Sequence, residues 1–151
     1  MLQLACPGDR EAVNALALQV HRLHTTWRPD IFIASQELYP ADRFLKAIEE
    51  RSLYVAKLGN VVVGYVLLNI RNVEGPGLMT QKRMHIGEFC VEQSVRNQGI
   101  GTEMMQDVWA LAKAFRCTDL HLGVYPQNDE AVGFYQKCGF TIKKIEMQRK
   151  V

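Results

Sequence analysis

The stretch Val91-Glu-Gln-Ser-Val-Arg-Asn-Gln-Gly-Ile-Gly-Thr102 joins an apolar run to an amphipathic segment. Apolar side chains recur in that segment at three- and four-residue steps, which predicts a helix with one buried face: Ile100, Met104, Val108, Leu111 and Phe115. The apolar run before it, Ile86 to Val91, reads as a strand. A glycine turn between a strand and a helix favours anion binding, because the first helical amides lack internal partners and the helix dipole adds positive charge. Gly99 and Gly101 also let a ligand approach the backbone closely.

The two glycines alone are equally typical of an ordinary turn. A Walker loop is excluded because no Gly-Lys-Ser/Thr follows, and the dinucleotide fingerprint lacks its third glycine. The stretch does fit Arg-x-x-Gly-x-Gly, from Arg96 to Gly101. That pattern resembles the pyrophosphate loop of the GNAT superfamily, the acetyl-CoA-dependent N-acetyltransferases. The family often has a proline two or three residues before the loop arginine, where this chain has Gln93 and Ser94.

A second motif carries the same resemblance. Residues from Asn128 to Phe140 are similar to the family's segment Asn-x-x-Ala-x-x-Phe-Tyr-x-x-x-Gly-Phe. The two motifs stand in the family's order and in the expected elements, and the resemblance covers nearly the whole chain. The segment from His24 to Phe32 resembles the acceptor-side region of some bacterial members more loosely.

Length and composition are those of one globular domain spanning residues 1–151. Hydrophobic residues make up 48% and charged residues 23% of the 151, and the formal net charge is only +2. This charge argues against a nucleic-acid or anionic-membrane partner. No apolar run approaches the roughly 18 residues of a membrane span.

The four cysteines, at positions 6, 90, 117 and 138, show no metal-ligand spacing. We therefore expect no metal site and reduced thiols, as in a cytoplasmic protein. The start of the chain has no signal-peptide pattern. Cys90 stands in an apolar run, which predicts an inert thiol.

The hydrophobic pattern predicts a mixed α/β sheet with helices on both faces, in the order β-α-α-β-β-β-α-β-α-β. The predicted strands are Leu2 to Cys6, Leu53 to Leu58, Val61 to about Asn72, about Arg83 to Val91, Asp119 to Tyr125, and Phe140 to Met147. The predicted helices run from Asp9 to about His24, from Tyr39 to about Arg51, from Ile100 to Phe115, and from Asn128 to Gly139. The early strands form an antiparallel meander, and the fourth and fifth are parallel because a helix connects them. This order is similar to the GNAT fold, which implies that the two parallel strands splay apart.

The resemblance implies acetyl-CoA as a co-substrate and names the residues that bind it. These are Arg96, Asn97, Gln98, Gly99, Ile100, Gly101 and Thr102 at the pyrophosphate, Phe89, Cys90 and Val91 along the pantetheine arm, and Asn128 and Tyr135. Backbone groups left unpaired by a splay would be costly unless a ligand filled the gap. An amide near Val91 would then polarise the thioester carbonyl.

Two side chains are the candidate catalytic residues. The resemblance makes Tyr135 the general acid for the leaving thiolate; otherwise it reads as a core aromatic, and Asn128 reads only as a helix cap. An amine with a pKa near 10.4 is only about 0.1% neutral at pH 7, so a base is needed. Glu88 is the best candidate, being an acid within an apolar strand; it is otherwise a solvent-facing charge. His85 and His121 are weaker candidates.

Strand alternation places Ile86, Glu88 and Cys90 on one face, unless a bulge changes the parity. Glu92, at the strand end, is expected to face solvent. The aromatic residues Trp27 and Phe32 are candidate acceptor-binding residues, or they cover the core together with Tyr39, and His24 reads as a packed histidine.

The leading interpretation is a cytoplasmic N-acetyltransferase, a monomer or homodimer, that moves an acetyl group directly to a primary amine in a ternary complex. A small amine or short peptide is the favoured acceptor, and a protein N-terminus or lysine is the alternative. A non-catalytic CoA-binding module is the rival from another class, and a protein that binds a different nucleotide is a distant third.

Overall fold

The structure, a computed structural model, describes residues 1–151. Its strands are Leu2–Leu4 (β1), Leu53–Leu58 (β2), Val61–Val73 (β3), Gln81–Val91 (β4) and Asp119–Leu122 (β5). Its α-helices are Arg10–Trp27 (α1), Ala41–Glu49 (α2), Ile100–Ala114 (α3) and Asp129–Lys137 (α4). The predicted order is confirmed up to the last helix.

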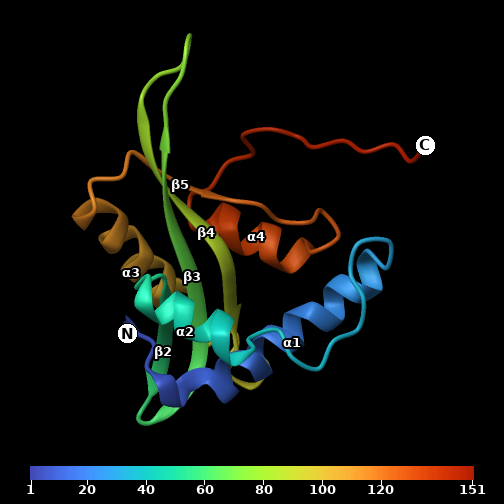
Figure 1. Ribbon diagram of the computed structural model, residues 1–151, viewed down its shortest axis with the longest axis vertical. Coiled ribbons are helices and arrows are strands. Elements are labelled where there is room, and N and C mark those ends of the chain that lie inside the picture. The colour runs from blue at the N-terminus through green and yellow to red at the C-terminus, as the bar shows by residue number, and fades with distance from the viewer.

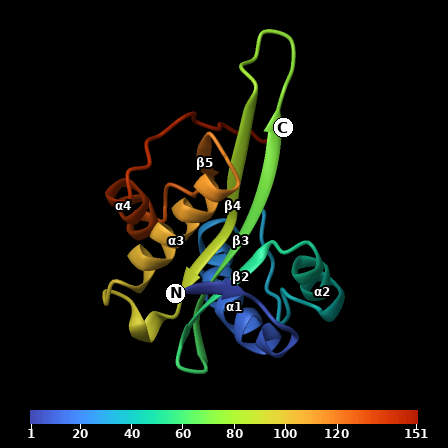
Figure 2. The ribbon, with the colours of Figure 1, turned by 90° about the vertical axis from the view of Figure 1, so that its left-hand side faces the viewer.

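The strands form one sheet in the order β1-β2-β3-β4-β5 (Figure 1). All neighbours are antiparallel except β4 and β5, which are parallel as predicted. The β2–β3 hairpin closes with Leu58 opposite Val61, and Gly59 supplies a positive φ of 59° in its turn. The β3–β4 hairpin is longer and extends beyond the helices as an arm (Figures 1 and 2).

A bulge in β4 decides which way its side chains point. Leu67 lies opposite Glu88 and Leu68 lies opposite Ile86, so Gly87 has no partner of its own. The extra residue reverses the alternation. Ile86 therefore packs toward α3, whereas Glu88 lies on the face covered by α1 and α2. Simple alternation, which would have put both on one face, is wrong here.

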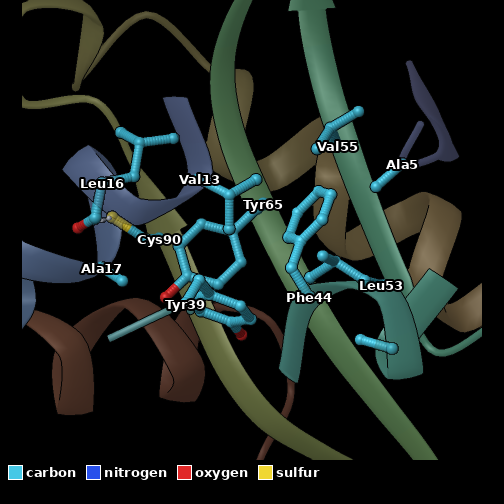
Figure 3. Close-up of a cluster of buried hydrophobic side chains, with 11 residues drawn as sticks. Ala5, Val13, Leu16, Ala17, Tyr39, Phe44, Leu53, Val55, Tyr65 and Cys90 are labelled. Carbon is cyan, nitrogen blue, oxygen red and sulfur yellow. Dashed lines mark hydrogen bonds between the residues drawn. The ribbon is translucent and has the colours of Figure 1, made fainter. Parts of the chain in front are cut away.

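Helices cover both faces of the sheet, α1 and α2 on one side and α3 and α4 on the other (Figure 2). On the first side, α1 and α2 bury residues such as Leu16 and Phe44 against Tyr65 of β3 and Cys90 of β4 (Figure 3). On the second side, apolar residues of α3 and α4 pack against Met84 and Ile86. Of the apolar stripe predicted for α3, Ile100, Met104 and Val108 are buried.

Strands β4 and β5 stay paired over only a short length. The pairs run from Arg83–Asp119 to Ile86–Leu122, after which β5 ends while β4 continues to Val91. The predicted fifth strand, to Tyr125, was therefore too long. Beyond Ile86 the β5-facing side of β4 has no strand partner, and this is the splay that the resemblance implied.

The predicted final strand, Phe140 to Met147, is wrong. No residue from 141 to 151 belongs to a strand, and Ile142, Ile145 and Met147 are 74%, 80% and 93% exposed. A strand forms only where its backbone finds a partner and one of its faces is buried, and this segment has neither. Farther along, Gln148 accepts a hydrogen bond from Arg28, and Lys150 lies 3.8 Å from Asp30.

Candidate active site

The loop before α3 presents a row of free backbone amides. The amides of residues 97 to 102 donate to no acceptor in the protein, and the first helical bond comes from Glu103 to Gly99. Gly99 has φ 86°, a left-handed conformation that favours glycine and turns the chain into the helix. Free amides at a helix start bind anions through hydrogen bonds and the dipole.

The other predicted phosphate-loop residues contribute in different ways. The Ile100 side chain is buried in the core, so only its amide can meet a ligand. A Cβ on Gly101 would lie 3.3 Å from the Phe134 ring, so glycine keeps α3 close to α4. Asn97 adopts a positive φ of 61°, and Gln98 and Thr102 are exposed.

Arg96 holds the loop against the end of β4. Its Nε donates to the Val91 carbonyl at 3.0 Å, and its Nη1 lies 3.9 Å from a Glu130 carboxylate oxygen. One carbonyl at the end of β4 is thereby satisfied from within the protein. The guanidinium remains beside the free amides and adds positive charge there.

The unpaired side of β4 begins beside this loop. Phe89, Cys90 and Val91 lie beyond the last residue that pairs with β5. Their side chains are engaged elsewhere, since Phe89 packs on Phe134 at 5.6 Å and the Cys90 thiol donates to the Leu16 carbonyl at 3.5 Å (Figure 3). The backbone groups of this stretch that face away from β3, apart from the Val91 carbonyl bound by Arg96, are available to an extended ligand with amides of its own. Burial raises the pKa of Cys90 to about 12, which disfavours the reactive thiolate form.

Glu88 is the centre of a polar cluster on the α1–α2 face. Its Oε2 accepts from the Tyr39 hydroxyl at 2.8 Å and from the Tyr65 hydroxyl at 2.7 Å. Its Oε1 accepts from the Arg43 guanidinium at 2.5 Å, and that guanidinium also lies 4.0 Å from the centre of the Tyr39 ring. Glu88 is thus not a solvent-facing charge. Burial, followed by the Glu88 charge, raises the pKa of both tyrosines, which stay protonated as donors.

Tyr135 lies on the opposite face of the sheet, among aromatic rings. It packs against Phe89, Phe134 and Phe140 with ring centres 5.4–6.3 Å apart. Its hydroxyl has no hydrogen-bond partner in the protein and is not sealed from solvent. Burial raises the pKa of Tyr135 to about 12, so it carries its proton at neutral pH. Asn128 is the helix cap that the sequence suggested, accepting from the Ala131 amide at 3.1 Å.

Trp27 and Phe32 lie in an aromatic cluster at the end of α1. The His24 ring stacks on Phe32 at 4.9 Å, and Trp27 lies 6.1 Å from His24. Tyr125, from the segment after β5, packs edge-on against both His24 and Phe32, at 5.5 and 5.8 Å. The cluster thus joins the end of α1 to the segment that follows β5. These two parts lie on either side of the gap that opens where β5 ends and β4 continues. His24 is packed, as predicted, whereas Tyr39 is a fully buried core residue.

Three site residues were missed at the sequence level: Arg43, Tyr65 and Tyr125. Tyr65 reads as an ordinary strand residue, and no local spacing links Arg43 to Glu88, which is 45 residues away. Glu92 was also misjudged: it is half-buried and accepts from the Gln19 amide at 2.7 Å, because α1 crosses the end of β4. His85 and His121 pair with each other across β4 and β5, Nδ1 to Nδ1, at 3.0 Å.

The chain belongs to the acetyltransferase (GNAT) family, whose profile matches residues 19–140. It is 27% identical over 100 residues to the uncharacterized N-acetyltransferase YvbK of Bacillus subtilis, covering 66% of this chain and 59% of that protein. It is 29% identical over 114 residues to the zebrafish (Danio rerio) N-alpha-acetyltransferase 50, covering 72% of this chain and 65% of that one. The chain spans about half to two thirds of the length of the curated relatives it matches.

Solved structures share the fold over the full chain. A mutant of the BH1408 protein from Bacillus halodurans is 26% identical, with a TM-score of 0.95 over 100% of this chain and 99% of that one. The aminoglycoside N-acetyltransferase AAC(6')-Iy in complex with CoA has a TM-score of 0.72 and 16% identity, over 100% and 99% of the two chains. None of the helices in this chain combines the length and apolar character that crossing a membrane requires.

Proposed function

We propose that the protein transfers the acetyl group of acetyl-CoA directly to a primary amine in a ternary complex. The observation that carries this proposal is the continuity of two unpaired backbone surfaces. The free amides of residues 97 to 102 adjoin the unpaired side of β4, so one surface suits a diphosphate and the next suits a chain with amides. CoA has these two parts in that order.

The loop amides would bind the diphosphate, with Arg96 beside them. The pantetheine arm would follow the backbone of Phe89, Cys90 and Val91 like an added strand. The thioester would then reach the point where β4 and β5 diverge, and an amide there would stabilise charge on its oxygen. The free Nδ2 of Asn128, whose Oδ1 caps α4, is available to the same arm.

Glu88 and Tyr135 are the proposed catalytic residues. A carboxylate has about four acceptor positions, and three of those on Glu88 are filled by Tyr39, Tyr65 and Arg43. The remaining position would hold the acceptor's ammonium group and prepare it for deprotonation. Tyr135, whose proton is retained at neutral pH, would donate to the leaving thiolate.

The acceptor is proposed to be a small amine or short peptide, bound beside Trp27 and Phe32. The names of similar proteins cover several classes: YjaB of Salmonella typhimurium is a peptidyl-lysine N-acetyltransferase, and AAC(6')-Iy acts on aminoglycosides. A protein lysine or N-terminus is therefore the second candidate. A non-catalytic CoA-binding module would need neither the Glu88 cluster nor a free Tyr135 hydroxyl.

Calorimetry with acetyl-CoA and CoA tests the proposal. Gly101→Glu is expected to weaken binding by about tenfold or more, because the added side chain would meet the Phe134 ring, displace the start of α3 and add a negative charge there. Gly75→Glu is the matched control, since Gly75 is exposed at the tip of the β3–β4 arm. Absence of acetyl-CoA binding by the wild-type protein, or equal loss in both variants, would refute the cofactor site.

A further inference from the structure

We propose that His24 is the base that takes the proton from the acceptor amine, and that Glu88 positions the ammonium. This inference rests on the proposed function and moves the proton-accepting step from Glu88 to His24. No local sequence pattern marks His24 as more than a packed residue of an apolar helix face.

The location of His24 is the first argument. The Cys90–Leu16 hydrogen bond fixes the middle of α1 against β4, and the His24–Tyr125 contact fixes its last turns against the segment after β5. The helix therefore reaches from β4 to the segment that follows β5. His24 covers this gap from the α1 side, while the aromatic rings around Tyr135 cover it from the α3–α4 side.

The state of the imidazole is the second argument. Three aromatic rings hold it, yet neither ring nitrogen has a hydrogen-bond partner in the protein, and neither is sealed from solvent. A packed histidine with no other role normally satisfies a ring nitrogen within the protein. His21, one turn earlier, does so with the Ile33 carbonyl at 2.6 Å. A ring held in place with both nitrogens open is suited to contact a ligand.

The charges around His24 suit a side chain that acts as a general base. Burial lowers the pKa of His24 below its usual 6.5, and His21 lowers it further, so the imidazole is neutral at pH 7. The Glu88 carboxylate, from β4, acts in the other direction and favours the imidazolium once it forms. Tyr125 faces the ring from beyond β5, and Arg28, which lies over Tyr125, is neutralised by Asp30 at 2.8 Å.

Glu88 is poorly placed to take the proton itself. A proton on its Oε1 would face the Arg43 guanidinium, which bonds the same oxygen, and its Oε2 already accepts two hydroxyls. Glu88 can instead accept a hydrogen bond from the ammonium, as a positioning residue.

Two side chains, His24 and Tyr135, then account for every proton in the reaction. An ammonium group loses two protons when it becomes an amide. The first moves to His24 and on to solvent, and the freed nitrogen lone pair forms the C–N bond to the thioester carbon. The C–S bond breaks with its electron pair on sulfur, which takes the proton of Tyr135. Tyr135 regains a proton from the nitrogen through water.

The test compares His24→Gln, His24→Ala and the control His21→Gln, using thiol release from acetyl-CoA with a panel of amines. His24→Gln is expected to lower kcat by about 10²-fold or more, to lose the acid limb of the pH–rate profile, and to leave acetyl-CoA affinity unchanged. Added imidazole should restore activity to His24→Ala, because the cavity left by the ring can admit the free base. His21→Gln should keep its rate and retain an acid limb, which moves to higher pH because His21 no longer lowers the pKa of His24.

Several outcomes would overturn the inference. One is a His24→Gln enzyme with near-wild-type kcat and an unchanged acid limb, and another is a His24→Ala enzyme that imidazole does not rescue. Loss of the acid limb in Glu88→Gln but not in His24→Gln would return the base role to Glu88. A wild-type protein that binds acetyl-CoA but transfers to no amine would refute the proposed function as well.

Discussion

Gly64→Ala is expected to destabilise the protein, because the fold leaves no room for a methyl group there. A Cβ on Gly64 would lie 2.7 Å from the Met104 sulfur and 2.8 Å from the Cys90 carbonyl oxygen. Met104 is fully buried in α3, and the Cys90 oxygen belongs to the backbone of β4. The Cys90 oxygen cannot move without shifting the strand that borders the proposed cofactor gap, and the Met104 side chain can move only by repacking a filled core.

Two opposing effects determine how much Gly64→Ala changes the free energy of unfolding. Overpacking a filled core costs about 1–3 kcal/mol, and replacing glycine recovers about 0.5–1 kcal/mol through the unfolded chain. Overpacking wins, leaving a net loss of about 1–2 kcal/mol in the free energy of unfolding. For a chain of this size, that loss corresponds to a fall in Tm of about 2–8 °C.

Gly133→Ala is the matched control. Gly133 lies inside α4 with nothing within 4 Å of its added Cβ. Alanine is favoured over glycine in a helix by about 1 kcal/mol, so this variant should be more stable than wild type. Urea unfolding followed by circular dichroism measures both. A Gly64→Ala protein as stable as wild type, beside a stabilised Gly133→Ala, would refute the close approach of α3 to β3 and β4.

Three further outcomes are expected. Tyr135→Phe should slow acetyl transfer without abolishing it, because a CoA thiolate can leave without a proton; an unchanged kcat in steady-state assays would remove Tyr135 from the mechanism. Burial raises the pKa of Asp9, but the Cys6 amide and Lys57 outweigh this and hold it below 3.8. The stability that Asp9 contributes is thus present above about pH 4 and lost as the pH falls through the lowered pKa; acid titration of Asp9→Asn should show a weaker pH dependence than wild type. Iodoacetamide at pH 8, followed by peptide mass spectrometry, should label the exposed Cys6 and spare Cys90; equal labelling would contradict the burial of Cys90.

The local pattern predicted most of the fold because each element carries its own signal. The helix that begins at Ile100, with Met104 and Val108 buried, and the Asn128 cap are short-range features that the structure confirms. Phe115, at the end of the predicted stripe, is instead 43% exposed. The last predicted strand failed for the opposite reason. Its β-branched pattern is local, but a strand needs a partner and a surface to cover, and these depend on the rest of the molecule.

The candidate site divides in the same way. By itself, the sequence determined the amide row before α3, because a glycine turn and a helix start leave those amides free wherever they occur. It also singled out Glu88 as an acid within an apolar strand, and Tyr135 through the family resemblance. The early end of β5, the bulge at Gly87 and the crossing of α1 over the gap were decided only by the tertiary structure. Register, twist and packing between distant segments set these features, so only the folded chain brings Glu88 of β4 and Tyr125 of the segment after β5 close to His24.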